Sequence, residues 1–406
     1  MAEQTGRSGP LAGMRVIELA HIMAGPVCGL MLADMGAEVI KVEKMEGDDT
    51  RRTVPPALEG ESAAYMMMNR GKRGLSLDLK NPDGVAVLRR LLANADALIE
   101  NYRGGTMERL GIGYETLRQE FPALVYCSLS GFGRTGPYAD RAGFDLVAQG
   151  MSGLMSVTGE GPGRPPMKCG PPVTDITAGI LAAMGVLAAY THRLRTGQGQ
   201  AVDTSLFEAG ITHTYWQSAI AMATGIAPGP MGSAHPLNAP YEAFETADGW
   251  ITIGAANQTN WLRMLKAIDA ETLAEDPRFA LNRDRMANRH DLAATLAPIF
   301  RGETSEVWLG RLEAGGVPAG PVLDVNAMHQ DPQALAREMV VEVEHSRVGR
   351  MKTLGLPVKF SDTPGRVHGP APLLGEHSRA ILAEAGYTAS EIDGLIDRGV
   401  VRETVA

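Results

Sequence analysis

The 406-residue sequence has few cysteines, few aromatic residues and no excess of positive charge. Its three cysteines, Cys28, Cys127 and Cys169, lie far apart and form no CxxC pair, so neither a disulfide framework nor a metal site is indicated. This pattern fits a reducing compartment, and we expect a cytoplasmic protein. The formal net charge of −9 argues against nucleic acid as a partner, although it allows one local basic pocket for a polyanionic ligand.

The sequence also lacks a signal pattern at its N-terminus and a very long apolar run. The longest such run, at about residues 180–190, is too short to span a bilayer, so we expect no membrane association. With 44% hydrophobic and 21% charged residues, the composition is that of a globular protein long enough for two packed domains.

Strand-like and helix-like stretches alternate through the first half of the chain. Five apolar runs predict buried strands, at residues 14–19, 38–43, 75–79, 97–99 and 124–129. Helical patterns separate them, at residues 26–35, 82–94 and 114–120. This alternation is typical of a mostly parallel sheet covered by helices, so we predict an α/β fold with a Rossmann-like large domain.

The pattern changes after a stretch dense in Pro and Gly at residues 226–240, which we interpret as a domain boundary. A hairpin pattern and three helical patterns then predict a smaller α+β domain, at residues 241–253, 259–267, 292–297 and 305–314. We therefore expect a large domain at 1–225, a small domain at 226–330, and a C-terminal return segment at 331–406 that packs on the large domain.

The stretch 170–199 places one carboxylate at the start of a long apolar helix. Pro171 and Pro172 cannot lie inside a helix, Asp175 follows them, and Gly197 ends the pattern. Small residues give this helix a thin surface on which another backbone can lie close. From spacing alone Asp175 is either a helix cap, contributing about 1 kcal/mol and no chemistry, or the residue that does the chemistry.

Basic residues gather at the ends of the early predicted strands: Lys44, Lys72, Arg73, Lys80, Arg103 and Arg109. Strand ends in an open α/β sheet face the ligand crevice, so these cations would converge on one region. Such a cluster would hold a phosphate-rich ligand by charge-assisted hydrogen bonds. The alternative for each of them is a solvated surface side chain.

Gly131, Gly133 and Gly136 match the G-x-G-x-x-G pattern of dinucleotide sites. Pro137 and Tyr138 stand where that fingerprint needs a helix to begin, which argues against a nicotinamide-dependent dehydrogenase.

Several of these motifs occur together in one known family. The stretches AHIMAGPVCGLMLADMGAEVIKVEKMEGDDTR (20–51), NRGKRGLSLDLKNPDG (69–84), IENYRGGTMERLG (99–111), SLSGFGRTGPYADRAGFDLVAQGMSG (128–153), 170–199 and PLLGEH (372–377) resemble class III CoA-transferases. Formyl-CoA and carnitine CoA-transferases belong to this family, and alpha-methylacyl-CoA racemase is a relative. The resemblance covers nearly the whole chain, in the same order.

The resemblance implies an interlocked-ring homodimer that transfers CoA from an acyl-CoA thioester to a small carboxylic acid, with no permanently bound cofactor. Asp175 matches the family's nucleophile, which passes through an aspartyl anhydride and an aspartyl-CoA thioester. Its place at a helix N-terminus would favour the ionised carboxylate. The residues that match the CoA site are Met23, Ala24, Lys44, Leu77, Lys80, Asn101, Tyr102, Arg103 and Arg109. Met23 stands where formyl-CoA transferase has glutamine, which indicates a more apolar pocket.

The main alternative is a racemase or another acyl-CoA isomerase. The racemase histidine falls in an AGHD motif where this chain has Phe144, which cannot accept a proton, followed by Asp145. His235 stands where formyl-CoA transferase has a glycine-rich loop, and is either a surface histidine or a catalytic one. A CoA-binding protein without turnover would need no nucleophile. Succinyl-CoA as donor, with a dicarboxylate or branched acid as acceptor, is a hypothesis from family analogy.

Overall fold

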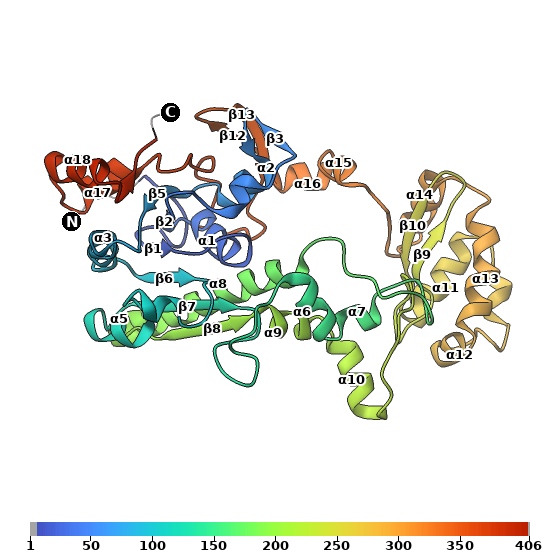
Figure 1. Cartoon of the computed structure of the whole chain (residues 1–406). Helices are drawn as coiled ribbons and strands as arrows, with labels where there is room; N and C mark the ends of the chain where they lie inside the picture. The colour runs from blue at the N-terminus through green and yellow to red at the C-terminus, as the bar shows by residue number, and fades with distance from the viewer. Residues whose placement is uncertain (1–5, 405–406) are drawn as a thin grey trace. The chain divides into compact units, whose positions relative to one another are not determined.

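The computed structural model describes residues 6–404, which separate into two compact units. The large unit contains residues up to 152, 170–213 and 332 onward, and the small unit contains 153–169 and 214–331 (Figure 1). The predicted boundary after residue 225 therefore differs from the observed one. Helix α10 (Tyr215–Thr224) and the segment 153–169 both belong to the small unit.

A seven-stranded sheet forms the centre of the large unit, in the order β14-β5-β2-β1-β6-β7-β8. Its strands are β1 (Arg15–Glu18), β2 (Glu38–Glu43), β5 (Arg73–Leu77), β6 (Ala97–Glu100), β7 (Val125–Ser130), β8 (Ala201–Ser205) and β14 (Val401–Arg402). All pair in parallel except β14, which is antiparallel to β5. The six parallel strands follow the 3-2-1-4-5-6 order of doubly wound folds, which confirms the predicted α/β class.

Alternate strand residues point to opposite faces of this sheet, because the side-chain period of a strand is two. Val16 and Val39 pack in one buried cluster, and Ile17 and Ile40 pack in another. The first cluster is covered by α1 (Ala24–Asp34), α8 (Val173–Thr196) and α9 (Leu206–Thr212). The second is covered by α3 (Pro82–Leu92), α5 (Tyr114–Glu120), α17 (Ser378–Glu384) and α18 (Ala389–Asp397).

Helix α8 ends before Gly197, as predicted, and is much longer than the apolar run at residues 180–190 within it. By length and composition it could cross a membrane, with a mean hydropathy of 1.6, so the expectation that it is too short was wrong. In this structure it packs against α1 through small residues. A Cβ atom on Gly179 would lie 2.6 Å from the carbonyl oxygen of Ala24, which confirms the close backbone approach predicted for this helix.

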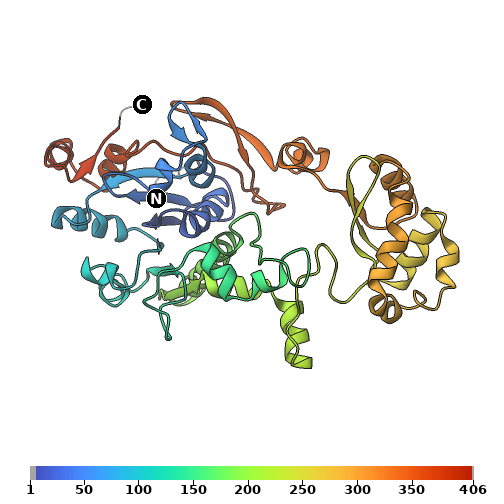
Figure 2. The same cartoon turned by 45° about the vertical axis from the view of Figure 1, so that its right-hand side comes forward.

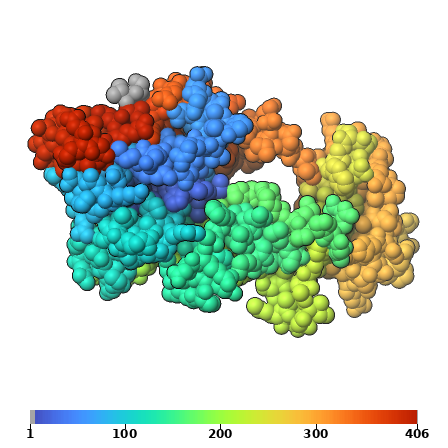
Figure 3. Space-filling model, viewed as in Figure 1, coloured from blue at the N-terminus to red at the C-terminus, as the bar shows by residue number. Residues whose placement is uncertain are grey.

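The C-terminal residues return to the large unit. The hairpin of β12 (Val340–His345) and β13 (Gly349–Leu354) precedes α17, α18 and the edge strand β14. Figure 3 shows the last part of this segment, in red, beside the N-terminal part of the unit, in blue. The remaining elements of the unit are short: β3 (Ala57–Leu58), β4 (Glu61–Ser62), α2 (Ala63–Asn69), α4 (Thr106–Arg109), α6 (Asp145–Met151) and α16 (Pro332–Ala336).

The small unit has a three-stranded antiparallel sheet, in the order β11-β10-β9, with helices beside it (Figure 2). Its hairpin of β9 (Tyr241–Glu245) and β10 (Trp250–Gly254) was predicted, and β11 (Ala319–Pro321) adds a third strand that was not. The helices are α7 (Leu154–Val157), α10, α11 (Gln258–Ala267), α12 (Asn282–Ala287), α13 (Arg289–Phe300), α14 (Ser305–Ala314) and α15 (Val325–Met328).

Candidate active site

Asp175 lies in the first turn of α8, but it does not cap the helix. Pro172 holds the N-cap position, and the capping oxygen comes from another element. Asp145, at the start of α6, accepts a hydrogen bond at Oδ1 from the backbone N–H of Thr174 (3.0 Å) and another from its hydroxyl (2.7 Å). The interpretation of Asp175 as a cap is therefore wrong, and its carboxylate is left for another purpose.

A pocket of about 510 Å³ opens in front of Asp175. Segments that follow β1, β6 and β7 form its walls, together with the first residues of α1 and α9. The residues that line it are His21, Ile22, Met23, Ala24, Asn101, Leu129, Ser130, Gly131, Gly143, Phe144, Asp175 and Leu206. Strand order reverses between β1 and β6, so this pocket lies at the topological switch point where doubly wound sheets bind ligands.

The Asp175 carboxyl group has an unusual pKa. Burial and, to a smaller extent, the nearby charge of Asp145 raise this pKa from 3.8 to about 7. No side chain within residues 6–404 donates a hydrogen bond to the carboxylate. The carboxylate thus lacks the side-chain donors that would favour its ionised form. Such a group titrates near neutral pH and combines ready ionisation with strong basicity, as nucleophiles and general bases require.

Asn101 joins the turns that follow β1 and β6. Its side-chain oxygen accepts a hydrogen bond from the His21 N–H (2.9 Å), and its amide nitrogen donates to the His21 carbonyl oxygen (2.8 Å). The same turn leads to Met23, the N-cap residue of α1, and to Ala24, its first residue. The structure thus brings three residues of the predicted CoA site into the pocket of Asp175: Met23, Ala24 and Asn101.

Two further cavities adjoin this pocket through shared lining residues. One, of about 1130 Å³, shares His21, Asn101 and Phe144 with it and is also lined by Tyr102 and Arg103. The other, of about 370 Å³, is lined by Tyr102 and by Lys44, whose ammonium group lies 2.8 Å from the carboxylate of Asp49. A hollow surface therefore extends from the carboxylate to two cations, which suits a long ligand with a reactive end and a phosphate end.

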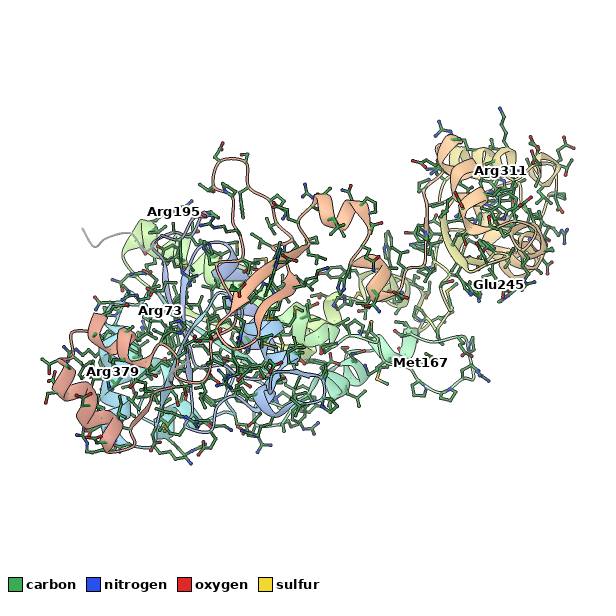
Figure 4. All side chains as sticks on the ribbon, turned by 90° about the horizontal axis from the view of Figure 1, so that it is seen from above. Arg73, Met167, Arg195, Glu245, Arg311 and Arg379 are labelled. Atoms are coloured by element: carbon green, nitrogen blue, oxygen red, sulfur yellow. The ribbon has the colours of Figure 1, made fainter. Side chains whose placement is uncertain are left out.

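Four of the predicted cations and one apolar residue lie elsewhere. Leu77 is 1% exposed in the core, and Lys80 and Arg109 line none of these three cavities. Lys72 is buried against Glu18. Arg73 pairs with Glu38 and Glu384, beside the C-terminal helices (Figure 4). Arg73 lies away from the crevice because it is the first residue of its strand, and only the carboxyl ends of parallel strands face the crevice.

Sequence reasoning missed three charged residues of this region. Asp145 entered the sequence analysis only as part of a racemase motif, and the structure places it at the start of α6. Arg134 and Arg141 line the larger cavity, and Arg134 pairs with the buried Glu100 at 2.6 Å. The only available signal for them was a loop rich in Arg and Gly after a buried strand.

Phe144 and the glycines at 131, 133 and 136 bear on the alternative functions. Phe144 lines the pocket of Asp175 with 68% of its surface exposed, and its side chain has no group that can accept a proton. After β7, the glycines at 131, 133 and 136 lead to turns, and the next helix begins only at Asp145. A dinucleotide fingerprint needs a helix directly after the glycines, so this stretch is not one.

His235 belongs to the small unit, where its ring packs near Trp216 and Tyr241 at centroid distances of 5.9 and 5.1 Å. Its Nδ1 accepts a hydrogen bond from the N–H of Leu237 (3.0 Å), and burial lowers its pKa. These contacts favour the neutral ring with the proton on Nε2.

Comparisons with known proteins show the family of this chain. The sequence profile of CoA-transferase family III matches residues 11–378. The chain is 41% identical to a succinate–glutarate CoA-transferase of Agrobacterium fabrum, over 95% of this chain and 98% of that protein. It is 40% identical to a succinyl-CoA:mesaconate CoA-transferase of Haloarcula marismortui, over 93% and 97%. The crystal structure of a CAIB/BAIF family protein from Brucella suis superposes with a TM-score of 0.83 at 40% identity, over 93% of this chain and all of that one.

Proposed function

Because this chain belongs to CoA-transferase family III and transfers CoA from an acyl-CoA thioester to a carboxylic acid, we propose that it does so through covalent intermediates on Asp175. The observation that carries the proposal is the isolated carboxylate in the pocket at the switch point of the sheet, with its pKa raised to about 7. Asp145 supplies the helix cap, so Asp175 has no structural duty of its own in the described chain.

The proposed reaction has four steps. A carboxylate oxygen of Asp175 attacks the thioester carbonyl carbon, the C–S bond breaks, and CoA leaves as a thiolate. The thiolate attacks the Asp175 carbonyl carbon of the resulting anhydride, which releases the donor acid and forms an aspartyl-CoA thioester. The acceptor carboxylate attacks the carbonyl carbon of that thioester, which expels the CoA thiolate and forms a second anhydride on Asp175. The thiolate then attacks the acyl carbon of the acceptor, which gives the new acyl-CoA and frees Asp175. Division into such steps is the usual advantage of covalent catalysis.

The cavities that adjoin the pocket support the proposed path of CoA. Met23 and Ala24 would border the thioester, Asn101 and Tyr102 would follow, and Arg103 and Lys44 would meet phosphate oxygens. Residues 6–404 contain no ion pair of Arg103, so its guanidinium is free to form charge-assisted hydrogen bonds. In this structure Leu77, Lys80 and Arg109 lie outside these cavities, so their part in CoA binding stays a prediction.

Small dicarboxylic acids are the proposed exchange partners. The relatives named above act on succinate, glutarate and mesaconate by their names. A panel of acyl-CoA donors and mono- and dicarboxylate acceptors, with the CoA esters separated by chromatography, tests this class. Transfer to monocarboxylates alone would contradict it.

The covalent step is tested by mass spectrometry of the protein incubated with an acyl-CoA. We expect an adduct on Asp175 that hydroxylamine removes, because anhydrides and thioesters react with that nucleophile. Asp175→Ala should give no adduct and no transfer. A fully active Asp175→Ala variant would refute the proposal.

Racemisation is the competing activity, and Phe144 argues against it. Exchange of an α-proton needs a base on each face of the carbon, and this pocket offers a phenyl ring at the position of the racemase histidine. Incubation of a 2-methylacyl-CoA with the protein in deuterated water tests the point. Deuterium incorporation at the α-carbon would favour the racemase, and we expect none.

We also propose an interlocked homodimer that works in the cytoplasm. Large apolar side chains lie exposed on α6 and α8 of the single chain, among them Leu146, Ile180 and Met184, and such surfaces often mark association. Free cysteines buried in the core support a reducing compartment. Light scattering of the purified protein should give twice the mass of one chain.

A further inference from the structure

Four charged side chains are buried beside the turn that leads into α1. Glu18 on β1 accepts from two lysines, with Oε1 3.1 Å from Lys41 Nζ and Oε2 2.7 Å from Lys72 Nζ. Lys41 Nζ also lies 2.9 Å from Asp48 Oδ2. The side chains of these residues are at most 1% exposed. We call these four residues the buried charge network.

The buried charge network holds the backbone on both sides of the turn. Lys41 donates to the carbonyl oxygen of Ala20 (2.8 Å), and Asp48 Oδ1 accepts from the N–H of Ile22 (3.1 Å). Lys72 donates to the carbonyl oxygen of Pro26, in the first turn of α1 (2.8 Å). The network therefore holds the segment that carries Met23 and Ala24 to the pocket of Asp175.

The turn needs such support because Ile22 has a φ of +67°. A β-branched residue in the left-handed region is strained, and it stays there only when its surroundings hold it. Asp48 binds the N–H of this very residue. Strain of this kind gathers at functional sites, and Ile22 lines the pocket of Asp175.

The network is a costly way to build a core. Buried ion pairs stabilise a fold no better than apolar side chains of the same size, so their use here points to geometry rather than stability. Helix α1 also accommodates the network, since a Cβ atom on Gly29 would lie 1.9 Å from Glu18 Oε2. A glycine within a helix lowers the stability of the helix, so the room for the buried charge network has a second cost in stability.

We infer that Asp48, held by Lys41, is a positioning residue for CoA transfer: it fixes the left-handed turn at Ile22 and thereby the place of Met23 and Ala24 beside Asp175. This inference rests on the proposed function of that pocket. It assigns Asp48 no contact with the reacting atoms. Its effect reaches the reaction through the turn alone.

The test is a double-mutant cycle between Asp48→Asn and Ile22→Gly. Asp48→Asn removes the negative charge that pairs with Lys41. We expect kcat to fall about 10- to 100-fold, because small misplacements of reacting groups reduce the rate by about that factor. The KM for acyl-CoA should change less than about threefold: Asp48 lines the cavity with Lys44, but the larger cavity with Arg103 is untouched. Glycine adopts positive φ without strain, so in the Ile22→Gly background the same Asp48→Asn change should cost at least about tenfold less.

A second buried pair gives the matched control. Asp34 and Arg70 lie 2.6 Å apart near the C-terminal end of α1, with side chains at most 4% exposed. Asp34→Asn should lower the melting temperature and leave kcat within about threefold of wild type. If Asp48→Asn does not fold, Asp48→Glu, which keeps the charge but displaces the carboxylate, enters the cycle in its place.

Three results would overturn the inference: an unchanged kcat for the Asp48 variant, an equal loss of kcat for Asp34→Asn, or an equal cost of the Asp48 change in both backgrounds. Failure of the proposed function is separate from these. It would appear as full transfer activity in Asp175→Ala, measured in the same CoA-ester assay.

Discussion

Asp145→Asn should make the enzyme more active in acid. The substitution removes the negative charge that helps to raise the pKa of Asp175, but it keeps an oxygen that can accept the hydrogen bonds of Thr174. The cap of α8 therefore survives, at a cost of about 1 kcal/mol for the exchanged hydrogen bonds. What changes is the proton affinity of the nucleophile.

The size of the effect follows from the two causes of the raised pKa. The pKa of Asp175 rises from 3.8 to about 7, and burial is the larger cause, so Asp145 accounts for less than half of the rise. Its removal should lower the pKa by about one unit. At pH 6 the ionised fraction of Asp175 would then grow from about one tenth to about one half, roughly a fivefold gain. At pH 8 the carboxyl group is ionised in both proteins.

The assay is the pH profile of kcat/KM for acyl-CoA, which reports ionisations of the free enzyme. The wild-type profile should rise with an apparent pKa near 7, and the variant profile should rise about one pH unit lower. Asp140→Asn, on the same loop but in the neighbouring cavity, is the control and should leave the profile in place. An unshifted profile for Asp145→Asn, or a shift towards higher pH, would refute the electrostatic account.

Three further outcomes follow from the structure. Asp175→Asn should raise the free energy of unfolding at pH 8 by about 1–3 kcal/mol and leave it nearly unchanged at pH 4. The unfolded chain ionises this carboxyl group near pH 4 and the folded chain only near pH 7, so the wild type loses stability as the pH rises between these values; urea denaturation at pH 4 and pH 8 measures this. Arg103→Ala should raise the KM for acyl-CoA about tenfold with little change in kcat, whereas Arg118→Ala, outside the cavities, should change neither in steady-state kinetics. Gly179→Ala should lower the melting temperature and reduce the free energy of unfolding by about 1–3 kcal/mol, because the added methyl group meets the backbone of α1. No loss of stability is expected for Gly310→Ala, because Gly310 has open space around it.

The central strands of the large unit could be predicted because each is an apolar run buried on both faces. Strand β8 was missed because it lies at the sheet edge, where its residues alternate between exposed and partly buried positions. Strand β14 has only two residues, and its pairing with β5 joins segments far apart in the chain. Neither strand carries a local signal, so only long-range pairing reveals them.

The parts of the site that could be predicted are those for which the sequence has a local signal. Asp175 could be found from its prolines, its helix and the family motif. The role of Asp145 could not, because capping from another helix depends on how α6 meets α8. Lys72 was predicted to join the cations at the ligand crevice, but it is buried against Glu18 on β1, and no spacing in the sequence connects these two residues.

The outer edge of β5 pairs with β14, so this edge of the sheet stays unpaired until residues far along the chain have been made. A ribosome that has released Leu77 must still synthesise the whole small unit before Val401 appears. At usual elongation rates this delay is on the order of tens of seconds. During that time the growing chain presents an unpaired strand edge, the kind of surface on which unfinished proteins associate with one another. The return of the chain to the large unit thus sets a period of vulnerability during synthesis, when a chaperone that covers sheet edges would act.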